Sequence, residues 1–109
     1  MDVLYTPRPT IDWKKQLEDG SDFFTKQAIA DSDKLLDDYL SALKKSKTEI
    51  EIWEAIENIV KGFDELNIKH GYFIETMERE DIAEFIQNSA EAAGLKYEGD
   101  VTEEWRTEW

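Results

Sequence analysis

The chain has 109 residues, of which 40% are hydrophobic and 36% charged, and its 26 acidic and 13 basic side chains give a net charge of −13. This length and apolar content predict a single folded domain and exclude an acidic disordered tail. The charge disfavours binding to nucleic acid or to an anionic membrane, because both would repel it. The lack of cysteine excludes disulfides and thiolate chemistry. No signal segment or apolar run of membrane-spanning length is present, so we expect a cytoplasmic protein.

The first ten residues predict an extended arm, because Pro7 and Pro9 fix their own φ and disfavour helix in the residue before each of them. Thr10 has the side chain of an N-cap for a short helix over residues 11–18. Trp13 and Leu17 are four residues apart in that segment, so they share one face. The sequence therefore predicts a short helix with an apolar side.

A first long helix is predicted over residues 23–45, where apolar side chains recur every three or four positions. Its weak point is the stretch 30–33, because short polar side chains there compete for backbone hydrogen bonds. A break and a restart, with Asp31 or Ser32 as the new cap, is therefore an alternative.

A second long helix is predicted over residues 47–70, and either Thr48 with Glu51 or Ser46 with Glu49 fits a reciprocal cap at its start. Its apolar stripe covers a wide face, which predicts the central position in a bundle. The stripe consists of Ile52, Trp53, Ile56, Ile59, Val60, Phe63 and Leu66.

Glycines mark two further features of this region. Gly62 inside the second helix indicates that a neighbouring backbone passes close by. Gly71 is suited to the left-handed position that ends the helix.

A third long helix is then predicted over residues 76–93, with Thr76 as its cap and acidic side chains at its start, where the helix dipole stabilises negative charge. The following Gly94-Leu95 predicts a Schellman ending.

A last short helix is predicted over residues 101–108, with Asp100 and Glu103 as its cap. A segment of this length is not stable alone, so Trp105 and Trp109 must dock on something. Two interpretations are open for these indoles: they anchor a binding partner, or they close the bottom of the core. The fold class is therefore all-α, with three long helices in a small bundle and short helical segments at both ends of a single domain, residues 1–109.

Metal or catalytic chemistry has little support in the sequence. His70, Glu75 and Glu78 are the nearest approach to a ligand set, but His70 is the only histidine and helical di-metal sites require paired Glu-x-x-His motifs. His70 is expected to interact instead with the C-terminal carbonyls of its own helix. Nucleophilic catalysis needs Ser or Thr beside a base, and no such pair is indicated. We therefore expect no enzyme activity, no catalytic residue, no metal and no cofactor.

The corner before the third helix is the main candidate for a binding surface. Glu75 and Arg79 are spaced for a helical ion pair, and Arg79 is a lone cation among carboxylates. It either relieves local charge or orients the carboxylates toward a basic partner. Glu78 continues the apolar stripe of the helix, where a nonpolar residue is expected. The predicted partner-binding residues are Glu75, Glu78, Arg79, Glu80, Trp105 and Trp109.

Several short segments resemble an uncharacterised bacterial family of short, acidic, all-helical proteins. They are Asp22-Phe23-Phe24, Ile52-Trp53, Leu66-Asn67, Ile74-Glu75-Thr76 with Arg79, and Ala93-Gly94-Leu95. The resemblance covers residues 20–95, and its most specific piece is Ile74-Glu75-Thr76-x-x-Arg79. In the family the aromatic pair is followed by Pro, where this chain has Thr25. The resemblance implies a helical fold and carries no activity, substrate or catalytic residue.

Three functional hypotheses are compatible with these features. The first is a non-enzymatic protein-binding module, acting as an immunity- or antitoxin-like inhibitor of a basic partner, by analogy with small acidic helical proteins that neutralise basic nuclease toxins. The second is a self-associating structural protein, for example a homodimer in which the Trp-bearing ends pack between subunits. The third is a carboxylate metal-binding protein. An acidic surface that serves only solubility is also open.

Overall fold

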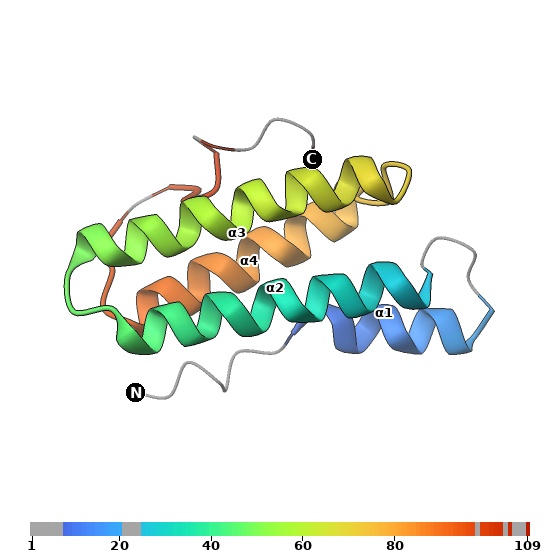
Figure 1. The fold of residues 1–109 in the computed structure, drawn as a ribbon, viewed down its shortest axis with the longest axis horizontal. Helices are drawn as coiled ribbons and strands as arrows, with labels where there is room; N and C mark the ends of the chain where they lie inside the picture. Colours follow the sequence, from blue (N-terminus) through green and yellow to red (C-terminus); the bar gives the residue numbers. More distant parts are fainter. Residues whose placement is uncertain (1–7, 21–24, 98, 104, 106–108) are drawn as a thin grey trace.

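A computed structural model describes residues 8–20, 25–97, 99–103, 105 and 109. These residues form four α-helices and turns, without a strand, which confirms the all-α prediction. The helices are α1 (Pro9–Glu18), α2 (Lys26–Lys45), α3 (Glu49–Lys69) and α4 (Thr76–Ala92). Helices α2, α3 and α4 run up and down the long axis of the molecule, and the short α1 lies beside the N-terminal half of α2 (Figure 1).

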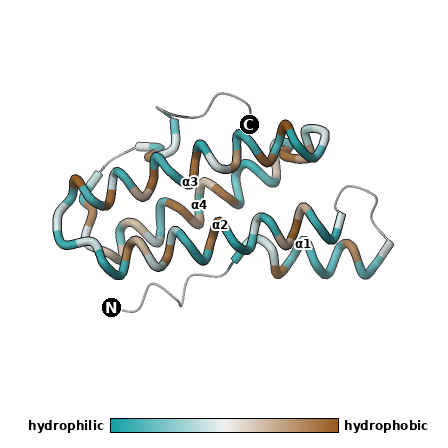
Figure 2. The backbone as a smooth tube through the Cα atoms, in the orientation of Figure 1, coloured by the Kyte–Doolittle hydropathy of each residue, from teal (hydrophilic) through white to brown (hydrophobic). Residues whose placement is uncertain are grey.

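Hydrophobic residues recur at short intervals along each helix (Figure 2), and their side chains from all four helices meet in one core, in which the α2–α3 pair is the most extensively packed. Most of the predicted stripe of α3 is buried, with Ile56, Val60 and Phe63 each 0% exposed, whereas Trp53 and Leu66 are half-buried. However, α3 is not the central helix. Within the described residues, α2 and α4 each contact all the other helices, whereas α3 contacts only those two. The rest of its wide apolar face is covered by the segment after α4.

The N-terminal helix begins earlier than predicted. Pro9 occupies the first turn of α1, and Arg8 before it is extended, with φ −83° and ψ 135°. Proline fits this position because its fixed φ is helical and its missing N–H has no intrahelical acceptor there. Thr10 is therefore not a cap. It is buried, and its hydroxyl donates to the carboxylate of Asp33 on α2. The remainder of the predicted arm, residues 1–7, lies outside the described residues.

Helix α2 is continuous, and the alternative of a break at residues 30–33 is wrong. It starts at Lys26, after Thr25, whose hydroxyl accepts the N–H of Ala28 at 3.0 Å. Ser32 is fully buried and donates its hydroxyl to the Ala28 carbonyl at 2.8 Å within the helix. The carboxylates of Asp31 and Asp33 are held by other helices, so they do not compete for the α2 backbone. Phe23 and Phe24, within the predicted range, lie outside the described residues.

Thr48 is the N-cap of α3, as one of the two predicted caps has it, but the return bond of Glu51 goes to the N–H of Lys47 and not to that of Thr48. The Thr48 hydroxyl accepts the Glu51 N–H at 3.3 Å, and the Glu51 carboxylate accepts the Lys47 N–H at 3.0 Å. The expected close backbone at Gly62 is wrong, because the neighbour is a side chain. A Cβ at Gly62 would lie 2.7 Å from Cδ2 of Leu35 on α2. The left-handed conformation predicted for Gly71 is confirmed, with φ +76°.

Helix α4 starts at the predicted residue 76 and ends at Ala92, one residue before the predicted end, but its N-cap differs from the prediction. Glu75, not Thr76, is the N-cap, and the Glu75 N–H donates to Glu78 Oε1 at 3.0 Å. The Schellman ending is confirmed, because Gly94 has φ +112° and the Leu95 N–H donates to the Ala90 carbonyl at 3.0 Å. Leu95 is thereby folded back into the core at 3% exposure.

Of the short helix predicted over residues 101–108, the structure describes residues 101–103 and 105, and these form turns. The N–H groups of Glu103 and Trp105 donate to carbonyls three residues before them, at 3.3 Å each. Glu104 and residues 106–108 lie outside the described residues. Helical geometry gives way here because the segment follows α3, where the Trp105 ring packs against Trp53 and the Trp109 ring against Phe63. Its course is therefore set by aromatic docking.

Trp109 belongs to the core. Its side chain is 9% exposed, and its Nε1–H donates to the Val60 carbonyl at 3.2 Å. Of the two interpretations of this indole, the structure supports closure of the core. Trp105 is half-buried, so one part of its ring packs on Trp53 while another part remains accessible.

Candidate partner-binding face

The predicted corner at the start of α4 is only partly assembled as expected. Glu75 and Glu80 are exposed, while Glu78 and Arg79 are half-buried. No ion pair joins Glu75 to Arg79 in the part of the chain that the structure describes. Glu78 needs no functional explanation for its place in the apolar stripe, because its carboxylate caps the helix start through the Glu75 N–H.

A buried asparagine that the sequence analysis did not single out fixes this corner. The side-chain oxygen of Asn67 accepts the Ile74 N–H at 2.8 Å, and its carbonyl accepts the Tyr72 N–H at 2.6 Å. Asn67 is 1% exposed, and Tyr72 is held in the left-handed region with φ +63°. One residue of α3, through its side chain and its carbonyl, thus holds the path from α3 to Glu75.

An acidic hollow of about 270 Å³ lies between α1 and α4, next to this corner. It is lined by Arg8, Pro9, Asp12, Asp81, Glu84, Phe85 and Asn88. The α4 residues are spaced by three and four positions, so they share one face of the helix. The acidic spacing on α4 is visible in the sequence. Asp12 joins these residues only because α1 docks beside α4. That docking cannot be read from the local sequence, so sequence reasoning missed this site.

The carboxylates of the hollow repel one another. Partial burial raises the pKa of Asp81, and the negative charges of Asp12, Glu78, Glu84 and Glu80 raise it further. Arg8, the cation among the lining residues, is turned toward α2, where its guanidinium pairs with Asp37 and lies 3.6 Å from Asp33. The hollow therefore keeps an excess of negative charge that its own arginine does not offset.

We expect Asp81→Asn to stabilise the protein at pH 7. A raised pKa in the folded state means that the folded chain binds the Asp81 proton more tightly than the unfolded chain, so stability falls as the pH rises and Asp81 ionises. Removal of the charge should increase the free energy of unfolding by less than about 1 kcal/mol, because solvent screens this half-buried group.

Urea unfolding at pH 7 and pH 3 measures this effect, with the exposed Asp38→Asn as the control. The gain from Asp81→Asn should disappear at pH 3 and shrink in high salt, whereas Asp38→Asn should change stability little at either pH. A loss of stability at pH 7 would show that the Asp81 charge is favourable in the fold.

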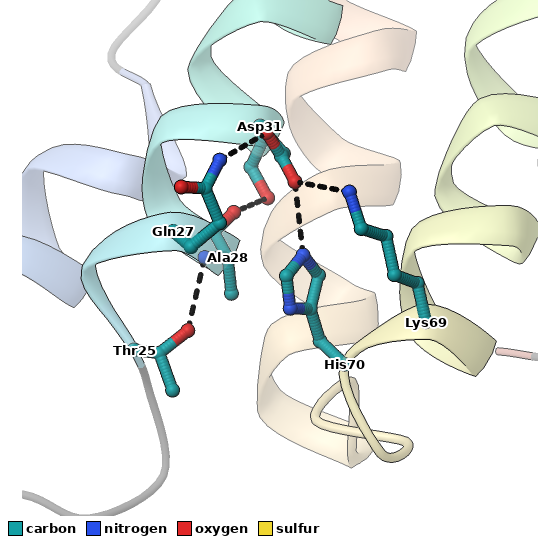
Figure 3. Close-up of polar contacts among 7 residues, drawn as sticks. Thr25, Gln27, Ala28, Asp31, Lys69 and His70 are labelled. Atoms are coloured by element: carbon teal, nitrogen blue, oxygen red, sulfur yellow. Dashed lines mark hydrogen bonds and ion pairs between the residues drawn. The ribbon is translucent and has the colours of Figure 1, made fainter.

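A second cluster of charges joins the start of α2 to the end of α3. Three side chains contact the carboxylate of Asp31 (Figure 3). Nε2 of His70 lies 3.0 Å from it, the ammonium of Lys69 lies 3.3 Å from it, and the Gln27 amide donates to it at 2.8 Å. His70 thus pairs with a carboxylate of another helix, and the expected interaction with its own helix carbonyls is wrong. The described residues contain no group of three His, Asp or Glu side chains placed to hold a metal ion. His70, Glu75 and Glu78 therefore do not form a ligand set.

This cluster makes stability depend on pH in the acidic range. Hydrogen bonds from His70 and Gln27 lower the pKa of Asp31 from 3.8 to about 2. The unfolded chain therefore binds this proton more tightly, so the contribution of Asp31 is present above pH 4 and is lost as the pH falls toward 2. We expect Asp31→Asn to melt below the wild type at pH 6 and to approach it near pH 2.

Melting temperatures of both proteins from pH 6 to pH 2 test this expectation. The difference between the two curves isolates Asp31 from the other acidic groups, and Asp38→Asn serves as the control that should follow the wild-type curve. A difference that stays constant over this range would contradict a role for the Asp31 charge.

A third cluster fastens α1 to α2. Lys14 pairs with Asp33 at 2.7 Å, next to Arg8 and the Thr10 hydroxyl. Burial alone would raise the pKa of Asp33, but the hydrogen bonds from Lys14 and Thr10 and the positive charges of Lys14 and Arg8 outweigh it and lower the pKa. The carboxylates of Asp33 and Asp37 are thus paired with cations, in contrast with the carboxylates of the hollow.

Comparison with known proteins gives no match, whether with protein families, curated proteins or solved structures. The resemblance to an uncharacterised bacterial family therefore stays a prediction. Among the described residues, no helix combines the length and the apolar character that crossing a membrane requires.

Proposed function

We propose that this protein is a non-enzymatic, cytoplasmic protein-binding module that holds a basic segment of a partner protein against α1 and α4, as an immunity- or antitoxin-like inhibitor would. The observation that carries the proposal is the acidic hollow, in which Asp12, Asp81 and Glu84 lie together while the neighbouring Arg8 is engaged elsewhere. Phe85 adds an apolar wall to the same hollow. A net charge of −13 would steer a basic partner toward this chain over a long range.

A lysine or arginine side chain suits the hollow with both its charged head and its apolar stem. Its charged head would reduce the repulsion among the carboxylates, and its apolar stem would pack along Phe85. Glu80 and the remaining residues of the predicted corner continue the negative surface along α4. The proposed contact face therefore includes Glu75, Glu78, Arg79 and Glu80 at its edge, with the hollow as its centre.

The alternative of self-association through the tryptophan ends gains no support from the structure. Trp109 packs within its own chain against Phe63, and Trp105 packs against Trp53. A carboxylate metal site likewise lacks a grouped set of ligands among the described residues.

Affinity capture from the native cell extract tests the proposal, with the wild type and two triple variants as bait. Asp12→Asn, Asp81→Asn and Glu84→Gln together remove the charge of the hollow. Asp19→Asn, Asp38→Asn and Glu54→Gln together make the same change in net charge at exposed positions elsewhere. The captured proteins are identified by mass spectrometry, at low and at moderate salt.

The expected result is a basic protein that the wild type and the control variant retain and the hollow variant loses. Equal loss by both variants would show that only the overall charge attracts the partner. No basic partner at either salt concentration, or equal retention by the hollow variant, would overturn the proposal.

A further inference from the structure

An aromatic hollow beside the N-terminal part of α3 has no role in the face between α1 and α4. It has a volume of about 180 Å³ and is lined by Trp53, Tyr97, Asp100, Val101 and Glu103. Trp53 comes from α3, while the other residues come from the segment after α4. The site therefore exists only when that segment lies along α3.

The two rings of this hollow form a right-angled corner. The centroids of Trp53 and Tyr97 are 5.0 Å apart, and their planes meet at 89°. In a T-shaped pair of this kind, a body placed in the corner touches the faces of both rings. Ring faces carry the negative end of the aromatic quadrupole, so they attract a cation.

The rings are held in place and remain accessible. Trp105 packs against Trp53 with a centroid distance of 5.8 Å, and Val101 beneath them is 1% exposed. Tyr97 is 48% exposed, so part of its ring stays accessible beside Trp53. Its accessible face is the kind of surface that a ligand would cover.

Two carboxylates complete the lining. Asp100 Oδ1 accepts the N–H of Thr102 at 2.8 Å and the Thr102 hydroxyl at 2.6 Å, which fixes its orientation. Glu103 is exposed at the rim. Aromatic faces combined with carboxylates select a positive charge, and an apolar floor favours a weakly hydrated one over a strongly hydrated ammonium.

The size of the hollow limits the ligand to a head group. Pockets for whole small molecules usually have volumes of roughly 300–1,000 Å³, whereas this one has about 180 Å³. We propose that Trp53 and Tyr97, with Asp100 and Glu103, form a cage for a quaternary ammonium head group, carried by a small molecule or by a methylated lysine. The site is independent of the acidic face between α1 and α4, because it shares no residue with it.

Nuclear magnetic resonance tests the cage directly, because the chain has four Trp indole N–H signals. Tetramethylammonium chloride is titrated into the ¹⁵N-labelled protein at constant ionic strength, and ammonium chloride is titrated in parallel. The Trp53 and Trp105 signals should shift and saturate in the millimolar range with tetramethylammonium only. The signals of the buried Trp13 and Trp109 should stay in place and so report an intact fold.

Matched variants locate the binding. Tyr97→Leu should weaken binding about fivefold or more, since it removes one ring face, and Glu103→Gln should weaken it about twofold or more. Tyr72→Leu and Glu65→Gln make the same changes at exposed positions elsewhere and should bind as the wild type does. An equal response to ammonium, a shift that does not saturate, or unchanged binding by Tyr97→Leu would overturn the proposal.

Two further ligands separate the sources of the head group. Choline represents a free small molecule, and an otherwise uncharged peptide with one trimethylated lysine represents a protein. Tighter binding of choline assigns the cage to small molecules, and tighter binding of the peptide assigns it to modified proteins. Failure of both, with no response to tetramethylammonium, removes the cage and leaves the proposal for the acidic face untouched.

Discussion

Trp13→Ala should lower the free energy of unfolding by about 3–5 kcal/mol, as expected for the loss of a large buried aromatic side chain. Trp13 is 1% exposed and packs edge-on against Phe73, with a centroid distance of 6.0 Å. Helix α1 has only 10 residues, so it is not stable without tertiary contacts. Ion pairs at partly exposed positions contribute about 1 kcal/mol or less each, so Arg8 and Lys14 cannot replace the indole.

Urea unfolding followed by circular dichroism measures this change. Ile11→Ala is the matched control in the same helix, because Ile11 is 64% exposed and its truncation should alter stability by less than about 0.5 kcal/mol. Trp13→Ala should also abolish capture of a basic partner, since α1 supplies Asp12 to the hollow. A loss below about 1 kcal/mol would show that Trp13 does not anchor α1.

Trp109→Ala is the second change with a large expected effect, again about 3–5 kcal/mol. The indole covers Phe63 at a centroid distance of 6.0 Å and donates to the Val60 carbonyl. Trp109→Phe keeps the ring contact and loses the hydrogen bond, so it should cost about 1 kcal/mol. The difference in the free energy of unfolding between Trp109→Ala and Trp109→Phe measures how much the apolar ring contact contributes to the docking.

The control for this pair is Met77→Ala, which truncates a side chain that is 71% exposed. It should change the free energy of unfolding by less than about 0.5 kcal/mol. If Trp109→Ala proved as mild as Met77→Ala, the segment after α4 would not be docked in solution. The aromatic cage would then be incomplete in the wild type as well. If the segment is docked, Trp109→Ala should weaken binding of tetramethylammonium, because the cage needs that segment along α3.

The long helices could be predicted from the sequence because their evidence is local. Apolar side chains at helical spacing, the Thr48–Glu51 cap and the Gly94-Leu95 ending each depend on residues within one or two turns. The alternative break at residues 30–33 depended on local evidence too, but other helices compete for the polar side chains there. At residues 30–33 the carboxylates of Asp31 and Asp33 are taken up by α3 and α1, and that information is absent from the local sequence.

The site was less predictable for the same physical reason. The acidic residues of α4 could be recognised, but their repulsion with Asp12 arises only once α1 has docked. Asn67 could be recognised neither by composition nor by spacing, because its two hydrogen bonds reach across a turn to Ile74 and Tyr72. The described residues of the segment after α4 show the converse, since residues 101–103 and 105 form turns where the local pattern predicts a helix, and Trp105 packs against Trp53 of α3.

The docking of Trp109 on α3 also decides which surface the protein shows when it opens locally. Trp109 lies 17 residues after Ala92, the last residue of α4. A segment outside the helices can detach while the helices stay packed. Phe63 and Trp53 then lose their ring partners Trp109 and Trp105, and a chain with bare aromatic surface is the form that chaperones bind.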